Sequence, residues 1–211
     1  MESRTFELRI PLEEDEIREL RTGDAVYLTG RVFTARSKFH IQGAEQGHYP
    51  RLDYGQMNCI IHIGPVFRKE EGGWRPVGFD PTTSYRFEKW APKVIRELRL
   101  RAMVGKTTMG KGTAEACREV GCVHLSRVGL PGSLLCGTIE RVVGVHGLEE
   151  LGMTEATWVL DVNRLGPFIV SIDTRGENLF DNLEGEFDRR FRELYRRFQI
   201  PEDFEYTLRV V

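Results

Sequence analysis

The chain has 211 residues, 40% of them hydrophobic and 29% charged, which suits one large globular domain or a domain with an appendage. Thirty Lys and Arg residues nearly balance thirty-two Asp and Glu residues, and the net charge of −2 excludes the broad positive surface used to bind nucleic acid or an anionic membrane. The longest strongly apolar run is only about as long as NCIIHI, which is too short to cross a membrane. We therefore expect a cytoplasmic protein with neither an export signal nor a membrane span.

Strands and helices are interspersed along the chain. The segment 37–56, rich in Gly, His, Gln and Pro, is predicted to be a long loop, and long loops in compact domains are often functional. This mixed order predicts a layered α/β domain rather than a regular doubly wound repeat. Strands are predicted at 6–10, 24–36 with an interruption at Gly30, 57–64, 101–105, 122–126, 139–146, 156–162 and 167–173. Helices are predicted at 11–20, from within 80–86 to 98 with Pro92 opening a new helix, at 113–120 and at 185–200, with a turn at 70–73 and a short helix or turn at 131–139.

The stretch DPTTSYR, residues 80–86, groups a proline, three hydroxyl side chains and an arginine. If a helix begins inside it, Thr82 and Arg86 lie one turn apart on the same face, near free backbone N–H groups at the positive end of the helix dipole. This arrangement could hold an anion. The same run is also typical of an ordinary helix N-cap, and the local sequence leaves both interpretations open.

The stretch MVGKTTMGKG contains the GKT that ends a phosphate-binding loop, but Leu100 occupies the position where that loop requires glycine. Lys106 follows a predicted strand, at the point where α/β proteins bind ligands. A solvated lysine and a ligand-binding cation both fit this position.

Four cysteines, in a chain without an export signal, are predicted to be reduced thiols. Cys117 and Cys122 lack the C-x-x-C spacing of common metal sites, so a metalloenzyme built from the cysteines and histidines is the weakest functional alternative. The four residues are Cys59, Cys117, Cys122 and Cys136.

The segment 185–200 has helical spacing with one aromatic face. Such a face usually packs on its own domain, and a subunit interface is the alternative. The apolar residues of the face are Phe187, Phe191, Leu194, Tyr195 and Phe198.

Several separated motifs, in a fixed order, resemble one family. GRVFTARSKFH, GFDPTTSYR, MVGK followed by EAC, GMTEATWVLDV and IVSIDTRGENLF are similar to segments of the β subunit, or C-terminal domain, of class I iron–sulfur fumarases and related tartrate dehydratases. The resemblance runs from roughly residue 11 to 180, and TAR, PTTS-x-R and M-x-G-K are its most specific parts.

The resemblance implies a substrate site formed by Arg36, Thr82, Arg86 and Lys106, with Thr82 as the catalytic base and Lys106 assisting it. This chemistry is plausible for a small dicarboxylate, because each arginine can fork onto a carboxylate and lysine adds a point charge. Asp80 stands where the family usually has glycine; a carboxylate is compatible with an anion site if it points away or pairs with a cation.

The implied fold is the swivelling β/β/α three-layer domain over residues 1–180, with 181–211 as a helical extension. The implied reaction is hydration of fumarate to malate, with a 4Fe–4S cluster held by a partner α subunit and no cofactor bound by this chain. Such a chain would be inactive alone and would form a homodimer or heterotetramer. The alternatives are a tartrate dehydratase β subunit and a non-catalytic carboxylate-binding or assembly module of the same fold.

Overall fold

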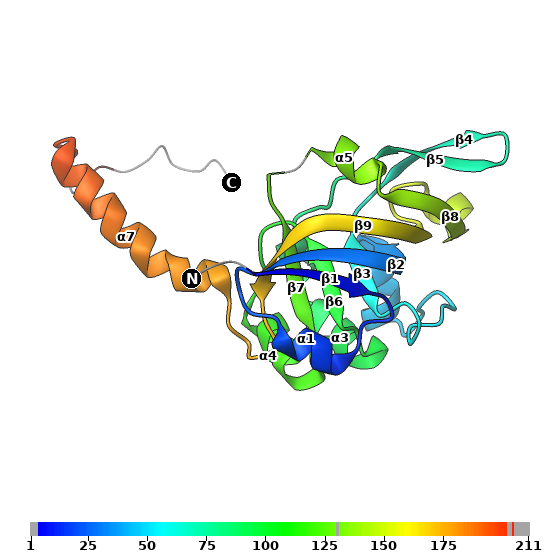
Figure 1. Cartoon of the computed structure of the whole chain (residues 1–211), viewed down its shortest axis with the longest axis horizontal. Helices are drawn as coiled ribbons and strands as arrows, with labels where there is room; N and C mark the ends of the chain where they lie inside the picture. The colour runs from blue at the N-terminus through cyan, green and yellow to red at the C-terminus, as the bar shows by residue number, and fades with distance from the viewer. Residues whose placement is uncertain (1–3, 130, 202–203, 205–211) are drawn as a thin grey trace.

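The computed structural model describes residues 4–129, 131–201 and 204 as a mixed α/β structure (Figure 1). Seven strands form one sheet in the order β1-β2-β3-β6-β7-β9-β8, and β4 and β5 form a separate hairpin. The strands are β1 Thr5–Arg9, β2 Ala25–Ala35, β3 Cys59–His62, β4 Val66–Glu70, β5 Gly73–Gly78, β6 Ala102–Gly105, β7 Val123–Arg127, β8 Ile139–His146 and β9 Thr157–Ile172. The helices are α1 Glu14–Glu19, α2 Ser37–His40, α3 Ala91–Leu98, α4 Lys111–Val120, α5 Gly132–Cys136, α6 Leu148–Leu151 and α7 Leu179–Arg197.

Strand β9 closes the sheet into a barrel-like ring, because it pairs antiparallel with β7, with β8 and also with β2. The sequence predicted two strands here, at 156–162 and 167–173, and this prediction was wrong: the structure has one strand of 16 residues. The chain continues through Gly166, whose φ of +143° few other residues adopt, and a Cβ there would lie 2.6 Å from the carbonyl oxygen of Val26. The close approach of β9 to β2 therefore depends on glycine.

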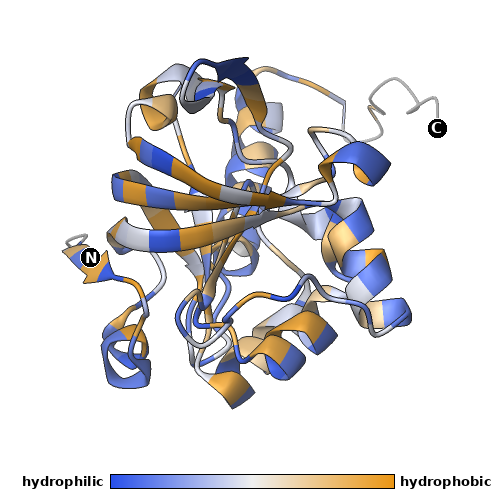
Figure 2. Cartoon of the chain, turned by 90° about the vertical axis from the view of Figure 1, so that its right-hand side faces the viewer, coloured by the Kyte–Doolittle hydropathy of each residue, from blue (hydrophilic) through white to orange (hydrophobic). Residues whose placement is uncertain are grey.

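Strands β1, β2, β3, β6 and β7 run parallel, so their carboxyl ends meet at one edge of the sheet. Their side chains alternate between two cores. Ile61 and Val104 belong to the core inside the ring, whereas Ile60 and Met103 belong to a second core that also contains Val94, from the helical layer. The helices beneath the sheet are accordingly apolar on one side and polar on the other (Figure 2).

The predicted loop at 37–56 is only partly irregular, because α2 and a π-helical turn at Ile41–Glu45 occupy its beginning. Phe39 is buried in the second core, and this tertiary packing stabilises helix in a segment whose glycine and proline content suggested a loop. The predicted turn near 70–73 joins β4 to β5. Pro92 lies in the first turn of α3, as predicted.

Helix α7 extends away from the sheet and its helical layer (Figure 1). The expectation that its aromatic face packs on its own domain was wrong: Phe187 is 56% exposed and Phe198 is 64% exposed. No helix in the described part of the chain is both long and apolar enough to cross a membrane.

Candidate functional site

The PTT turn lies across the carboxyl ends of two neighbouring parallel strands. The Thr82 N–H donates to the carbonyl of His62, which ends β3, at 2.7 Å. The Lys106 N–H donates to the carbonyl of Thr82 at 3.0 Å, and the Ser84 N–H donates to the carbonyl of Lys106 at 3.1 Å. These bonds hold Thr82 beside Lys106, two residues that the sequence separates by more than twenty positions.

A 3-10 helix at Ser84–Phe87 follows the turn and places Arg86 over Thr82. The Arg86 Nη2 group donates a hydrogen bond to Thr82 Oγ1, although Thr82 lies before the helix and its cap, and not inside a helix as the predicted spacing of one turn required. The residue that caps this helix is Thr83, and its side chain makes no capping bond in the described part of the chain. The hydroxyl of Thr82 therefore faces a cation and does not cap a helix.

Lys106 follows the last residue of β6, Gly105, whose backbone lies against the PTT turn. A Cβ at Gly105 would lie 1.6 Å from Ser84 Oγ and 3.3 Å from the carbonyl oxygen of Thr82. Only glycine permits this contact, which brings Lys106 to the turn.

Arg36 extends from the carboxyl end of β2, next to β3. Its Nη1 lies 3.1 Å from the position of a Cβ at Gly64, so the guanidinium packs over the chain just after β3. Arg36 Nε also forms an ion pair with Glu155 Oε1 at 3.5 Å, and the second oxygen of Glu155 accepts a bond from the N–H of Lys38 at 2.8 Å. β2 and β6 lie on either side of β3, so the backbones at Arg36 and Lys106 are separated by roughly 10 Å, two strand spacings.

The charge of this cluster is balanced by two acids. Asp80 pairs with Arg127 Nε at 2.9 Å, and its other oxygen lies 4.0 Å from Lys106 Nζ. Asp80 is therefore compatible with an anion site, because its carboxylate is paired with cations. The local charge is +2, with four cations (Arg36, Arg86, Lys106 and Arg127) against two acids (Asp80 and Glu155).

Sequence reasoning missed Arg127 as a member of this cluster. It ends β7, the strand next to β6, and its side chain is 17% exposed. A cation at the end of a predicted strand, the signal that singled out Lys106, would have found it.

Buried histidines lie directly beneath the turn and were also missed. His62 Nδ1 lies 2.9 Å from Ser84 Oγ, and its Nε2 lies 3.2 Å from Nε2 of His40, which stacks on Phe87. Burial, together with the neighbouring His40, His124 and Arg86, lowers the pKa of His62 well below its usual value. Burial likewise lowers the pKa of His40 to about 3, so both rings are neutral at pH 7. A histidine inside the apolar run NCIIHI was the available signal.

The cysteines do not fit an iron–sulfur cluster. Cys59, Cys117 and Cys122 are fully buried, and burial raises the pKa of Cys59. Cys136 is partly buried on α5. Across residues 4–129, 131–201 and 204, no group of three or more His, Cys, Asp and Glu side chains is placed to hold a metal ion.

We predict that Gly105→Ala lowers the free energy of unfolding by about 1–3 kcal/mol, because its methyl group must displace Ser84 and the PTT turn. Gly144→Ala on β8 is the matched control, since nothing lies within 4 Å of a Cβ there. Chemical denaturation of both variants checks this. Equal stabilities would show that the turn does not depend on close contact at Gly105.

The structure thus defines an α/β protein with a cationic cluster at the carboxyl ends of parallel strands, the edge at which α/β proteins bind ligands. The chain belongs to the family described as the fumarase C-terminus, which it matches over residues 1–183.

Curated relatives cover most of the chain. It is 36% identical over 183 residues to the L(+)-tartrate dehydratase subunit beta of Escherichia coli, covering 87% of this chain and 90% of that protein. It is 34% identical over 185 residues to a protein of Methanocaldococcus jannaschii provisionally named L(+)-tartrate dehydratase subunit beta, covering 87% and 95%. A protein of Geobacillus stearothermophilus, provisionally named fumarate hydratase class I, is 35% identical over 184 residues, which cover 87% of this chain and 35% of that protein.

Proposed function

We propose that this chain is the β subunit of a hydro-lyase that reversibly adds water to a small unsaturated dicarboxylate, with fumarate and malate as the first candidate pair. The observation that supports this most is the convergence of Arg36, Thr82, Arg86 and Lys106, from three separate segments, at the carboxyl ends of β2, β3 and β6. The net local charge of +2 matches the charge of a dicarboxylate. We also propose that residues 1–180 form a swivelling β/β/α domain and that 181–211 are an extension of it.

In this proposal Arg36 binds one carboxylate and Arg86 the other, each by a forked pair of N–H donors. Lys106 adds a point charge beside Thr82. Glu155 holds Arg36 in place before substrate binds, and Asp80 does the same for Lys106 together with Arg127.

In the dehydration direction, deprotonated Thr82 acts as the base that removes the proton from the carbon next to a carboxylate, and in the hydration direction its hydroxyl returns that proton to the carbon. A threonine hydroxyl is a weak base, and its deprotonated form requires nearby cations. Arg86 contacts the Thr82 hydroxyl directly, and Lys106 adjoins Thr82 through the backbone, so we assign the supply of that positive charge to these two residues.

The site is open on this chain: the side chain of Arg36 is 32% exposed and that of Lys106 is 39% exposed. Proton abstraction and electrostatic stabilisation both work better where water is excluded. We therefore propose that an α subunit covers the site and carries the 4Fe–4S cluster, a Lewis acid for the hydroxyl that departs in the reverse reaction. The beta-subunit names of the relatives support such a partner.

L(+)-tartrate is the second candidate substrate. The relatives that match over nine-tenths or more of their own length carry its name, whereas the protein named for fumarate is matched over 35% of its length.

The experiment is anaerobic copurification with the α subunit, followed by assays with fumarate, malate and L(+)-tartrate. We expect turnover by the complex and none by either subunit alone.

Arg36→Ala and Arg86→Ala should each raise KM, because each variant leaves a substrate carboxylate unpaired. The expected loss of substrate-binding free energy is on the order of 2–4 kcal/mol.

Arg141→Ala is the matched control, because Arg141 pairs with Asp161 between β8 and β9, outside the cationic cluster. An assembled complex that binds dicarboxylate without turnover would contradict the proposed hydro-lyase activity and favour a non-catalytic carboxylate-binding module.

A further inference from the structure

Helix α7 is fixed to the domain at its first turn. The Asn178 side chain accepts a hydrogen bond from the N–H of Phe180 at 3.1 Å, and its amide donates to the carbonyl of Met109 at 3.1 Å. Thr108 Oγ1 donates to the same Asn178 oxygen at 3.0 Å. From this anchor the 19 residues of α7 extend away from the domain, over roughly 28 Å (Figure 1).

One face of α7 exposes large apolar side chains at spacings of three and four residues. Phe187 is 56% exposed, Phe191 47%, Leu194 44% and Phe198 64%. A contiguous apolar stripe of this kind is characteristic of an interaction surface. Most of α7 also lies beyond residue 183, where the family match ends, so the family does not account for this surface.

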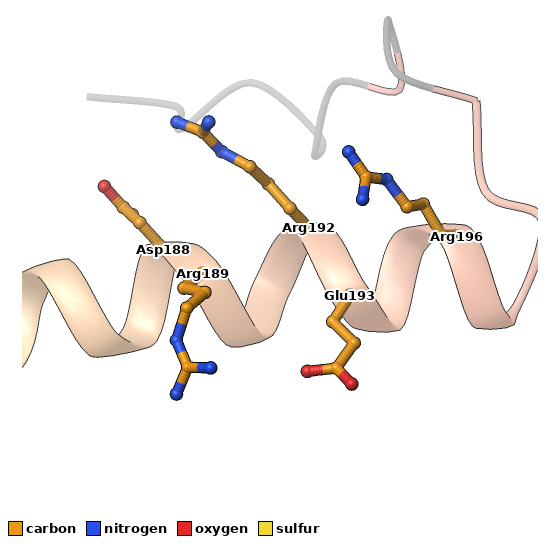
Figure 3. Close-up of a pocket in the computed structure, with 5 residues that line it drawn as sticks. All are labelled: Asp188, Arg189, Arg192, Glu193 and Arg196. Carbon is orange, nitrogen blue, oxygen red and sulfur yellow. The ribbon is translucent and has the colours of Figure 1, made fainter.

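The charges of α7 are divided between its two halves. Residues 179–188 carry four acids and no base, whereas residues 189–197 carry five arginines and one acid. Figure 3 shows charged side chains around the boundary and in the basic half, where Arg192 and Arg196 point to one side of the helix. The acids of the first half are Asp181, Glu184, Glu186 and Asp188, and the arginines of the second half are Arg189, Arg190, Arg192, Arg196 and Arg197.

The phenylalanines of the apolar stripe are arranged symmetrically about Arg189, the boundary between the two charged halves, whereas Leu194 has Glu184 at its mirror position. Phe187 and Phe191 each lie two residues from Arg189, and Phe180 and Phe198 each lie nine residues from it. If two such helices are laid antiparallel with their Arg189 residues level, aromatic residues meet aromatic residues. The acidic half of each helix then lies beside the basic half of the other.

We propose that α7 is a dimerisation helix, which pairs antiparallel with α7 of a second copy of this chain about a two-fold axis level with Arg189. A two-fold interface requires one surface to be complementary to itself, and α7 meets this requirement in both apolar pattern and charge. A parallel pair would set four acids beside four acids and five arginines beside five, which opposes association. The charge pattern thus selects both the partner and the orientation.

The first test is sedimentation of the 211-residue chain over a range of concentrations. We expect a dimer of twice the 24.3 kDa chain mass. Phe187→Glu combined with Phe191→Glu should weaken dimerisation at least 100-fold without changing the circular dichroism of the domain. Val77→Glu is the matched control, because Val77 is 56% exposed on β5 and should leave the dimer intact. A parent chain that remains monomeric at about 100 µM overturns the proposal.

A charge-exchange experiment tests the electrostatic part. Two triple variants are designed so that both halves of α7 carry net charge of the same sign, positive in one variant and negative in the other. Each variant alone should be monomeric, because its helices repel each other, and the two variants should form a mixed dimer when combined. One replaces Glu184, Glu186 and Asp188 with lysine, and the other replaces Arg189, Arg190 and Arg192 with glutamate. Dimers of each variant alone, as stable as those of the parent chain, would overturn the role of charge.

The orientation is tested by crosslinking, in a Cys136→Ser background that removes the partly exposed thiol. On oxidation of a mixture, Phe180→Cys chains should form disulfides with Phe198→Cys chains, because the antiparallel pair sets these positions level. Disulfides between two Phe180→Cys chains instead would show a parallel pair and overturn the antiparallel order.

Discussion

We expect Thr82→Ala to lower kcat of the hydro-lyase reconstituted with its α subunit by on the order of 10²- to 10⁴-fold, with little change in KM. The proton is removed only in the transition state, so loss of the base affects turnover more than substrate binding. This prediction depends on the proposed function and tests its most specific residue.

The geometry around Thr82 explains why this hydroxyl, rather than a neighbouring one, is the candidate base. Arg86 can only donate hydrogen bonds, so Thr82 Oγ1 accepts from it, and the hydroxyl proton of Thr82 is directed elsewhere. The guanidinium also stabilises the deprotonated form of the hydroxyl. The backbone of Thr82 is fixed on both sides, through its N–H to His62 and its carbonyl to Lys106, so the base has a defined position.

Two variants serve as controls. Thr82→Ser keeps the hydroxyl and should retain most of kcat, whereas Thr83→Ala removes the neighbouring hydroxyl and should leave kcat close to that of the parent. Thermal melting should show Thr82→Ala folded, with a loss of no more than about 1 kcal/mol, because the Thr82 side chain does not cap the helix that follows. A kcat near that of the parent would falsify the assignment of Thr82 as the base.

The part of the site that could be predicted from sequence is the part set by local geometry. Thr82 and Arg86 are only four residues apart, so a hydrogen bond between their side chains could be anticipated, although Thr82 lies before the 3-10 helix that carries Arg86. Lys106 could be placed at the end of a strand by hydrophobic pattern alone. Its contact with the PTT turn could not, because it depends on β3 and β6 being neighbours in the sheet and on the missing side chain at Gly105.

The ion pairs that the two acids of the cluster form were not predictable, because their partners come from distant segments. Glu155 lies more than a hundred residues from Arg36, and Arg127 reaches Asp80 only because β7 lies next to β6. Similarly, the alternation of apolar residues located the strands, but it gave no sign that β9 would run unbroken through Gly166 and close the sheet onto β2. Pairing between distant strands, rather than local preference, determines these features.

We expect the free energy of unfolding to fall steeply as the pH is lowered from 6.5 to 5, because of three buried histidines. His40, His62 and His124 are fully buried, and burial lowers the pKa of each, to about 3 for His40 and for His124. In the unfolded chain a histidine has a pKa near 6.5. Below that pH the unfolded state therefore binds protons that the folded state excludes, and stability falls as the pH falls.

The expected loss in the free energy of unfolding follows from the same linkage between protonation and folding. Each of these histidines costs on the order of 1.5 kcal/mol between pH 6.5 and 5, so the three together cost about 4–5 kcal/mol, a large part of a typical folding free energy. Carboxyl groups of the unfolded chain titrate mainly below pH 5, so the histidines dominate this interval. The loss continues as the pH falls towards 3, where His40 and His124 begin to take up protons in the folded state.

Urea denaturation at successive pH values measures this dependence, with a constant m-value as the check on two-state unfolding. His124→Asn is the informative variant: the Asn side chain can replace the contact of His124 Nδ1 with Ser171 Oγ, and His124 Nε2 has no hydrogen-bond partner in the described part of the chain. This variant should lose about a third of the pH dependence. A free energy of unfolding that stays constant between pH 7 and 5 would show that the histidines take up protons in the folded state and are not the neutral, buried rings described above.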